Sequence, residues 1–190
     1  DAVNDAPIAS GSPSLASVSE DNTDPSGESV STLFASSFSD TDSDTLKAVA
    51  ITANTADSVT EGSWQYSADS GSSWTSIPTS GLSESAALYL NSSTLIRFLP
   101  VADFNGTPGA ITARFIDSAY APNPSVGDQI NVSSNGGSAS FSAQLVSLTT
   151  SIDAVNDSGS FSGDSSKSGD EDDSSITGTL AFSDDNDGAS

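Results

Sequence analysis

A five-residue segment, Asp-Ala-Val-Asn-Asp, occurs twice in this chain, at residues 1–5 and again at residues 153–157. Two further matches follow both copies in the same order: Glu20-Asp21 with Glu171-Asp172, and Phe38-Ser39-Asp40 with Phe182-Ser183-Asp184. Self-similarity of this kind is the signature of a tandem array, in which each repeat is one structural module. The sequence therefore predicts a linker at 1–5, a complete module at 6–152, a second linker at 153–157 and the N-terminal part of a further module at 158–190.

The charge and composition of the chain limit its function. Four Lys and Arg residues stand against 26 Asp and Glu residues, a formal net charge of −22. Such a surface repels nucleic acid and anionic membranes and attracts divalent cations. The chain has no Cys and no His, so it lacks a thiolate nucleophile and the commonest general base. No group of Ser, Asp or Glu suggests a catalytic triad or a glycosidase acid pair, and we expect no enzyme.

The apolar residues alternate with a period of two, which is typical of half-buried β-strands. Strands are predicted near Leu15–Val18 and Val30–Phe38, and over Leu46–Asn54, Gly62–Ser67, Ala86–Leu90, Thr94–Leu99, Ile111–Ile116 and Ala139–Ile152. Turn signals such as Asn105-Gly106 separate them. Seven to nine short strands predict an all-β module, an antiparallel Greek-key β-sandwich. Two more strands are expected around Ile176–Phe182, in a second β module too short to bury a core of its own.

The linker and the acidic segments carry a resemblance to a known family. Residues 1–7, Asp-Ala-Val-Asn-Asp-Ala-Pro, resemble the cadherin inter-repeat linker D-x-N-D-N-A-P, with one extra residue and with Ala6 in place of Asn. Ser19-Glu20-Asp21 and Phe38-Ser39-Asp40-Thr41-Asp42 are similar to two cadherin acidic motifs. Ala113-Arg114-Phe115-Ile116-Asp117 is similar to a third, although Ser118 stands where Gly would follow. The resemblance implies a cadherin-like or Ig-like fold.

The middle of the chain departs from cadherins and has no L-D-R-E segment. Its F-x-P-x-A-D-F-N-G run at 98–106, with the aromatic segment 62–74, resembles bacterial cadherin-like repeats of giant RTX adhesins. The tail, with Gly163-Asp164 and Ile176-Thr177-Gly178-Thr179-Leu180, resembles the opening of a VCBS repeat from the same proteins. This resemblance implies a secreted protein of the bacterial cell surface.

The resemblance also implies calcium ligands at both linkers. The second linker would contribute Asp153, Asn156 and Asp157, joined by Glu20 and Asp117 from the module before it and by Asp184 and Asn186 from the module after it. At the first linker, Asp1, Asn4 and Asp5 would meet Asp40 and Asp42 in a weaker site that lacks its upstream partners. Further candidates are Asp44 and Asp187, and a separate loop site at Asp103 and Asn105.

Elementary electrostatics supports a cation at these positions. Two carboxylates roughly 5 Å apart repel each other by about 0.8 kcal/mol in water and about 3 kcal/mol at an effective dielectric constant of 20. Ca²⁺ takes six to eight oxygen ligands in an irregular geometry, whereas Mg²⁺ demands a near-ideal octahedron. Transition metals prefer nitrogen and sulfur ligands that the chain lacks. The expected cofactor is therefore Ca²⁺.

We expect a calcium-rigidified extender module of a secreted bacterial adhesin, which serves cell adhesion and biofilm formation by projecting a distal ligand-binding domain. Its partners would be neighbouring repeats of the same polypeptide. One alternative is a carbohydrate- or surface-ligand-binding module with Trp64, Tyr66 and Trp74 as a platform. Trp64 and Tyr66 share a strand face that in a sandwich is usually core, which favours burial. A third interpretation is an accessory domain of an extracellular hydrolase.

Overall fold

The computed structural model describes residues 3–164, 166, 168–172, 175 and 177–183. Of the predicted ligands, Asp1, Asp184, Asn186 and Asp187 lie outside the described residues. The strands are β1 (Ile8–Ala9), β2 (Val18–Ser19), β3 (Glu28–Ser29), β4 (Phe38–Ser39), β5 (Leu46–Asn54), β6 (Gly62–Ser67), β7 (Thr75–Ser76), β8 (Ala87–Asn91), β9 (Leu95–Pro100), β10 (Ile111–Asp117), β11 (Gln129–Ile130), β12 (Val146–Leu148), β13 (Ile152–Asp153), β14 (Ser160–Gly163) and β15 (Leu180–Ser183). The helix is α1 (Val30–Leu33). Within the described ranges, no helix is long and apolar enough to cross a membrane.

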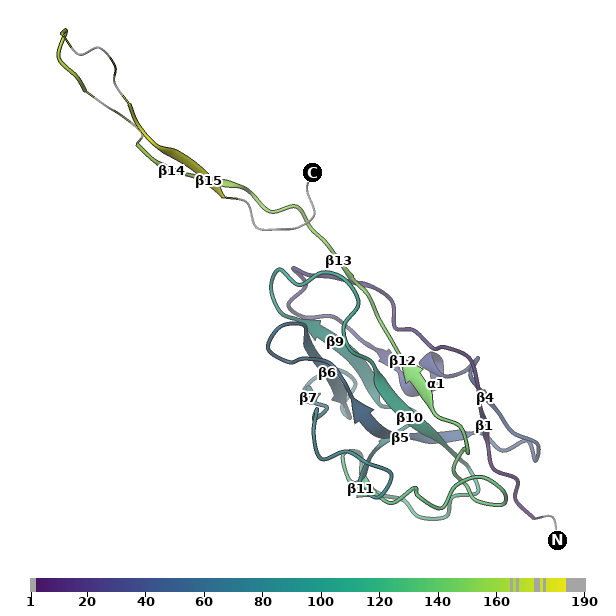
Figure 1. Ribbon diagram of the computed structural model, residues 1–190. Coiled ribbons are helices and arrows are strands. Elements are labelled where there is room, and N and C mark those ends of the chain that lie inside the picture. Colours follow the sequence, from purple (N-terminus) through teal and green to yellow (C-terminus); the bar gives the residue numbers. More distant parts are fainter. Residues whose placement is uncertain (1–2, 165, 167, 173–174, 176, 184–190) are drawn as a thin grey trace.

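Two antiparallel sheets form the body of the module (Figure 1). One has the order β11-β8-β5-β10-β12 and the other the order β3-β9-β6-β7. Both sheets contribute to a single apolar core, in which Trp64 and Phe98 of one sheet join Ile51, Leu90 and Phe115 of the other. The expected all-β, sandwich-like character is therefore confirmed.

The five-stranded sheet is buried on both faces, which its alternating side chains explain. Val49 and Ile51 of β5 point into the main core, whereas Ala48 and Ala50 join a second apolar cluster with Tyr89 on the opposite side. Within this second cluster, burial raises the pKa of the Tyr89 hydroxyl, and the nearby Tyr120 makes a smaller contribution in the same direction. The long segment between β10 and β12 provides the cover for this outer face, through residues such as Val132 and Phe141.

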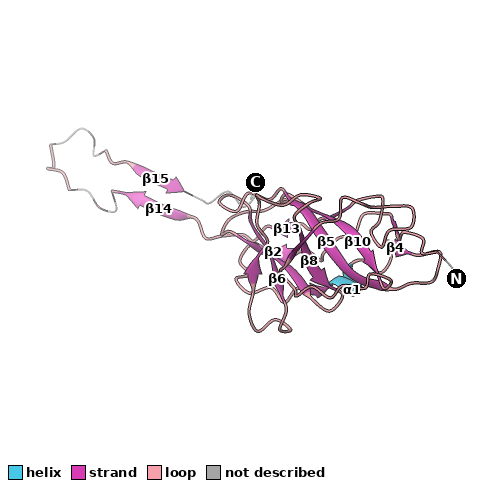
Figure 2. Ribbon diagram, turned by 90° about the horizontal axis from the view of Figure 1, so that it is seen from below, coloured by secondary structure: helices cyan, strands magenta, loops and turns pink. Residues whose placement is uncertain are grey.

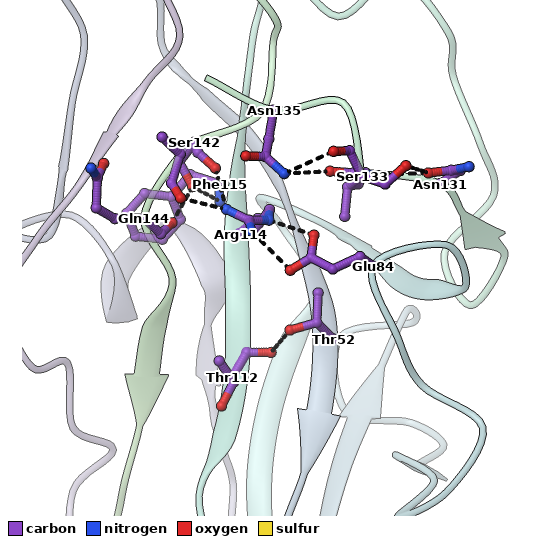
Figure 3. Close-up of polar contacts among 12 residues, drawn as sticks. Thr52, Glu84, Thr112, Arg114, Phe115, Asn131, Ser133, Asn135, Ser142 and Gln144 are labelled. Atoms are coloured by element: carbon purple, nitrogen blue, oxygen red, sulfur yellow. Dashed lines mark hydrogen bonds and ion pairs between the residues drawn. The ribbon is translucent and has the colours of Figure 1, made fainter. Parts of the chain in front are cut away.

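Arg114 holds this covering segment in place (Figure 3). Its guanidinium makes a two-point ion pair with Glu84, at 2.6 Å (Nε to Oε2) and 2.9 Å (Nη2 to Oε1). Its Nη1 donates to the carbonyl oxygens of Ser142, at 2.6 Å, and Ala143, at 2.8 Å. The prediction of a strand over 139–145 was wrong. The segment touches β10 only locally, through a bridge between Ile116 and Phe141 and main-chain hydrogen bonds from Asp117 to Ser140 and from Ser142 to Phe115. These contacts do not extend into a strand, and the Arg114 side chain bonds the next carbonyl groups instead, which the apolar alternation did not reveal.

The predicted strand over Val30–Phe38 was also wrong at its start, because Val30–Leu33 forms one helical turn. The hydroxyl of Ser29 caps this turn by accepting a hydrogen bond from the Thr32 main-chain nitrogen at 3.2 Å, which satisfies a free helix-end donor. Val30, Leu33 and Phe34 all face the core. Their spacing of three and four residues is the helical period, which the sequence analysis did not recognise in so short a segment.

The module closes by pairing its beginning with its end. β2 and β13 are parallel, with Val18 opposite Ile152. Main-chain hydrogen bonds extend this contact on both sides, from the Leu15 nitrogen to the Thr149 oxygen at 2.9 Å and from the Glu20 nitrogen to the Asp153 oxygen at 3.1 Å. The chain enters at the end that holds β1 and β4 and leaves at the opposite end, beyond β13 (Figure 1).

Beyond β13 the chain forms a hairpin that projects away from the module (Figure 2). In this hairpin Phe161 of β14 lies opposite Phe182 of β15, with ring centroids 5.0 Å apart. The register repeats that of the β1–β4 ladder, where Ala9 lies opposite Phe38. Phe38 packs against Phe115 in the module, whereas Phe161 and Phe182 are 71% and 57% exposed. The two ladders are therefore alike in pairing and different in surroundings.

Replacing Arg114 with Met should detach the covering segment, because Met fills similar space but cannot bond Glu84 or the two carbonyl groups. We expect unfolding free energy to fall by about 2–4 kcal/mol, measured by urea denaturation. Arg114→Lys, which retains the charge but not the fork geometry, should recover only part of this loss. Full stability of the Met variant would contradict the role assigned to Arg114.

The Asp69 carboxylate should titrate at an unusually low pH. The hydroxyls of Ser73, at 2.6 Å, and Ser67, at 2.7 Å, and the Ser73 main-chain nitrogen donate to it, and these bonds lower its pKa from 3.8 to about 2. Because the folded pKa is depressed, the associated stability is present above pH about 4 and is lost as pH falls through about 2. Carboxyl-carbon NMR titration should show the Asp69 pKa rising in Ser73→Ala, with the low pKa of Asp57 unchanged as the control.

Candidate metal centre

A loop of alternating acidic residues, Asp40-Thr41-Asp42-Ser43-Asp44, follows β4 at the entry end of the module. Oδ1 of Asp40 accepts hydrogen bonds from the main-chain nitrogens of Asp42, at 2.8 Å, and Asp44, at 3.2 Å. Ser43 adopts the left-handed conformation, with φ of 68°, which turns the chain back on itself. The fold of the loop brings carboxylate oxygens of all three Asp residues within 4.8 Å of one another.

The first linker docks on this loop. The main-chain nitrogen of Asp5 donates to Oδ2 of Asp42 at 2.6 Å. The amide of Asn4 donates to Oδ2 of Asp117 at 3.2 Å, at the end of β10, where Asp117 is fully buried. Asp44 approaches the same place, because its Oδ1 accepts a 2.5 Å hydrogen bond from the hydroxyl of Ser118. We call the set Asn4, Asp5, Asp40, Asp42, Asp44 and Asp117 the entry cluster.

The entry cluster concentrates negative charge with little local compensation. At a separation of 4.8 Å, two carboxylate charges repel by about 0.9 kcal/mol in water and by about 3.5 kcal/mol at an effective dielectric constant of 20. Both ion pairs found among the described residues, Arg97 with Asp24 and Arg114 with Glu84, lie outside the cluster. Oδ2 of Asp40 is buried and has no hydrogen-bond partner within the described part of the chain. A buried carboxylate oxygen without a partner is costly unless a donor or a cation meets it.

The chemistry of the entry cluster fits a hard divalent cation. Carboxylate and amide oxygens are its only side-chain ligands, and Ca²⁺ accepts six to eight oxygens in variable geometry. Asp40, Asp42 and Asp44 would hold the ion directly. Asp5 is bonded to Asp42 of this triplet, and Asn4 is bonded to Asp117 of the same cluster, so the same ion would also fix the position of the linker.

A second arrangement, at the exit end, holds the second linker. Glu20 is 3% exposed, and its Oε1 accepts a hydrogen bond from the Val155 main-chain nitrogen at 2.6 Å. Its Oε2 accepts from the amide of Asn105 at 3.2 Å. We call Glu20, Asn105, Asp153 and Val155 the exit cluster. Its hydrogen bonds tie the repeated linker to the module.

The grouping of Asp117 with Glu20 at the second linker was wrong. Strand β10 has seven residues and spans roughly 20 Å at about 3.4 Å per residue. Asp117 lies at its entry end, beside Asn4, whereas Glu20 lies beside Val155 at the exit end. The motif similarity identified Asp117 as an acidic strand end but carried no information on which end of the module it occupies.

The other predicted ligands have less definite surroundings. At the second linker Asp153 is exposed and Asp157 half-buried, and the Asn156 amide donates to the Asp157 main-chain oxygen at 2.8 Å. Asp103 is exposed in a left-handed turn, with φ of 63°. The separate loop site at Asp103 and Asn105 gains no support from the geometry, because Asn105 faces Glu20.

The sequence did not reveal the full role of two residues in these clusters, Asp44 and Asn105. Asp44 was only an additional candidate, although it belongs to the central acidic triplet. Asn105 was assigned to a different site, although it supports Glu20. The alternation of Asp at 40, 42 and 44 was the available signal for the first, whereas nothing in the sequence indicated the contact between Asn105 and Glu20, which are 85 residues apart.

The aromatic residues do not form an exposed platform. Trp64 is fully buried and donates from its ring nitrogen to the Gly109 oxygen at 2.8 Å, so its predicted place in the core is confirmed. Tyr66 is half-buried against the same core. Trp74 is half-buried and packs beneath the guanidinium of Arg97, 4.0 Å from its ring centroid.

Comparisons with protein-family models, curated proteins and solved structures found no match. Function is therefore inferred from the residues of the chain itself. Of these, the two clusters are distinctive because each joins a copy of the repeated pentapeptide to one end of the module.

Replacing Glu20 with Ala should release the second linker while leaving the core intact. The variant removes the acceptor for the Val155 main-chain nitrogen, and a hydrogen bond to a charged group contributes about 1.5–3 kcal/mol. We expect the Val155 amide to exchange with solvent at least roughly tenfold faster, measured by hydrogen-exchange NMR. Asp21→Ala, at the exposed neighbouring position, is the matched control and should leave this exchange rate unchanged.

Proposed function

We propose that this chain is a calcium-rigidified structural module of a secreted bacterial surface adhesin. In this proposal the module is a cadherin-like Greek-key sandwich that separates a distal ligand-binding domain from the cell, and it performs no catalysis. The observation that carries the proposal is the acidic triplet of the entry cluster, whose carboxylates lie within 4.8 Å of one another and beside the linker.

The position of the acidic triplet supports a mechanical role for the ion. Asp5 is bonded to Asp42 through its main chain, so an ion held by Asp40, Asp42 and Asp44 would sit where the linker meets the module. Without a cation, repulsion among these carboxylates opposes close packing of the linker. With Ca²⁺ bound, the same charges attract the ion, and the junction becomes stiff.

The path of the chain also supports an extender. The two copies of the pentapeptide meet opposite ends of the module (Figure 1), which is the geometry that tandem modules need to form a rod. In the five-stranded sheet β5 lies between β8 and β10, which come later in the sequence. This order is consistent with the proposed Greek-key connectivity.

The resemblance to RTX adhesin repeats provides the biological context of the proposal. Extracellular calcium modules bind Ca²⁺ with dissociation constants of about 10⁻⁴ to 10⁻³ M. A protein with that affinity is flexible where calcium is scarce and stiff outside the cell, where the proposed adhesin serves cell attachment and biofilm formation. The competing platform of Trp64, Tyr66 and Trp74 is disfavoured by the burial of Trp64.

Bound calcium should raise the free energy of unfolding of the module, and removal of calcium should lower it again. At a concentration 100 times the dissociation constant, one site adds about 2.7 kcal/mol of stability, which corresponds to roughly 5–10 °C in melting temperature for a chain of this size. Calorimetric titration should give the affinity directly, and EDTA should reverse the thermal shift.

Asp42→Asn is the informative variant for this experiment. It removes one ligand charge but retains an oxygen that can accept the hydrogen bond from Asp5, so the loop keeps its fold. We expect calcium affinity to fall about tenfold or more, because ligand charge tunes such sites. Asp172→Asn makes the same change of net charge at an exposed position of the hairpin region and should bind like the original chain. Absence of calcium binding, or equal losses in both variants, would refute the proposal.

A further inference from the structure

A cavity of about 610 Å³ lies on the module, where β2 and α1 contribute to its lining. It is bounded by the segment Ser12–Val18, by the loop Pro25–Glu28 and by α1, with Arg97 of β9 in its wall. Its size is within the range of about 300–1,000 Å³ typical of small-molecule sites. The residues that line it combine apolar side chains such as Leu15, Val18 and Leu33 with many hydroxyl groups.

Arg97 is the most unusual residue of this cavity, because it is 6% exposed and only partly satisfied. Its Nε donates to Gln65 at 2.8 Å, and its Nη1 donates to Asp24 at 2.6 Å and to the Pro25 oxygen at 2.9 Å. Its Nη2 donates no hydrogen bond to any residue that the structure describes, in contrast to Arg114, in which each guanidinium nitrogen donates at least one. Nη2 is not sealed in the protein interior, and Arg97 lines the cavity, so we infer that this donor faces the cavity.

The surrounding groups determine what kind of acceptor Arg97 can meet. Glu28 lines the cavity and Asp24 is ion-paired with Arg97, so two negative charges stand against the single positive charge of Arg97. An anionic ligand would therefore meet a net repulsion, which the charge of −22 on the whole chain reinforces. A neutral ligand avoids this repulsion and still accepts from Arg97.

Hydroxyl groups dominate the remaining polar lining, which includes Ser12, Ser14, Ser17, Ser26, Thr32 and Ser36. Hydroxyls both donate and accept, as does each hydroxyl of a sugar. Glu28 Oε1 accepts from the Ser29 main-chain nitrogen at 2.8 Å, which leaves Oε2 as an acceptor for a sugar hydroxyl. Leu15, Val18 and Leu33, which are 7%, 9% and 8% exposed, contribute the apolar atoms of the lining.

We propose that this cavity binds a neutral saccharide unit, anchored by Arg97 Nη2 and oriented by Glu28 and the serine hydroxyls. The site differs from a platform of Trp64, Tyr66 and Trp74, because none of these rings lines the cavity. Trp74 instead supports the guanidinium of Arg97 from its other side, at 4.0 Å. The proposal does not rest on calcium binding.

Saturation-transfer NMR on the full chain tests this site. The probes are the methyl glycosides of glucose, galactose, mannose and N-acetylglucosamine, with glucuronic acid as the charged comparison and a neutral Ser-Gly tetrapeptide as the peptide comparison. We expect transfer to at least one neutral glycoside at millimolar concentration, and weaker transfer to the acid and the peptide. Trp64 is buried, so a change in tryptophan emission on binding reports on Trp74 beside Arg97.

Two variants, with one control, test whether the glycoside binds in this cavity. Ser36→Trp puts a large side chain at an exposed position of its lining and should abolish transfer, whereas Ser80→Trp, at an exposed position elsewhere, should preserve it. Arg97→Lys keeps the charge but loses the fork, and should weaken binding about tenfold. The proposal is wrong if no neutral glycoside binds, if Ser36→Trp binds like the original chain, or if the acid or the peptide binds best.

Discussion

The parallel pairing of β2 with β13 is the constraint on which the arrangement of this protein depends. It joins segments 134 residues apart, as the hydrogen bond from Thr150 to the Ala16 oxygen also shows. Because the closing strand ends at Asp153, the second copy of the pentapeptide begins where the module ends. The first copy meets the acidic loop at the other end. Both linkers therefore emerge along the long axis of the body, and their spacing follows from the length of the sandwich-like core.

Charged groups are arranged differently in the interior of the module and at its entry end. The interior carries little charge, and its two buried cations, Arg97 and Arg114, are each paired with a carboxylate. At the entry end the fold instead crowds like charges together, and it leaves one buried oxygen of Asp40 without a partner among the described residues. The other buried side-chain oxygen and nitrogen atoms of the described residues have hydrogen-bond partners, so the open position at Asp40 is consistent with a place for a cation.

The sequence was informative where a regular pattern determines the structure. The strands Leu46–Asn54 and Gly62–Ser67 were predicted with their observed bounds, because alternation and flanking turns are local. The burial of Trp64 followed from the same alternation. Asp40 and Asp42 were named from the family resemblance; the structure brings them together with Asp44, and their role as metal ligands stays a prediction. Predictions failed where contacts between residues distant in sequence determine the structure. Arg114 binds the segment 139–145, which forms no continuous strand, and β10 places Asp117 at the entry end of the module.

The closure by β2 and β13 has a consequence for how the module assembles. Contacts between segments so far apart are costly in loop entropy, so we expect them to form late and to slow the folding of the chain. While the polypeptide is being synthesised, β2 lacks its parallel partner until residues 152 and 153 become available. The module then acquires its last strand and its exit linker in one step, so an incomplete chain retains an open edge.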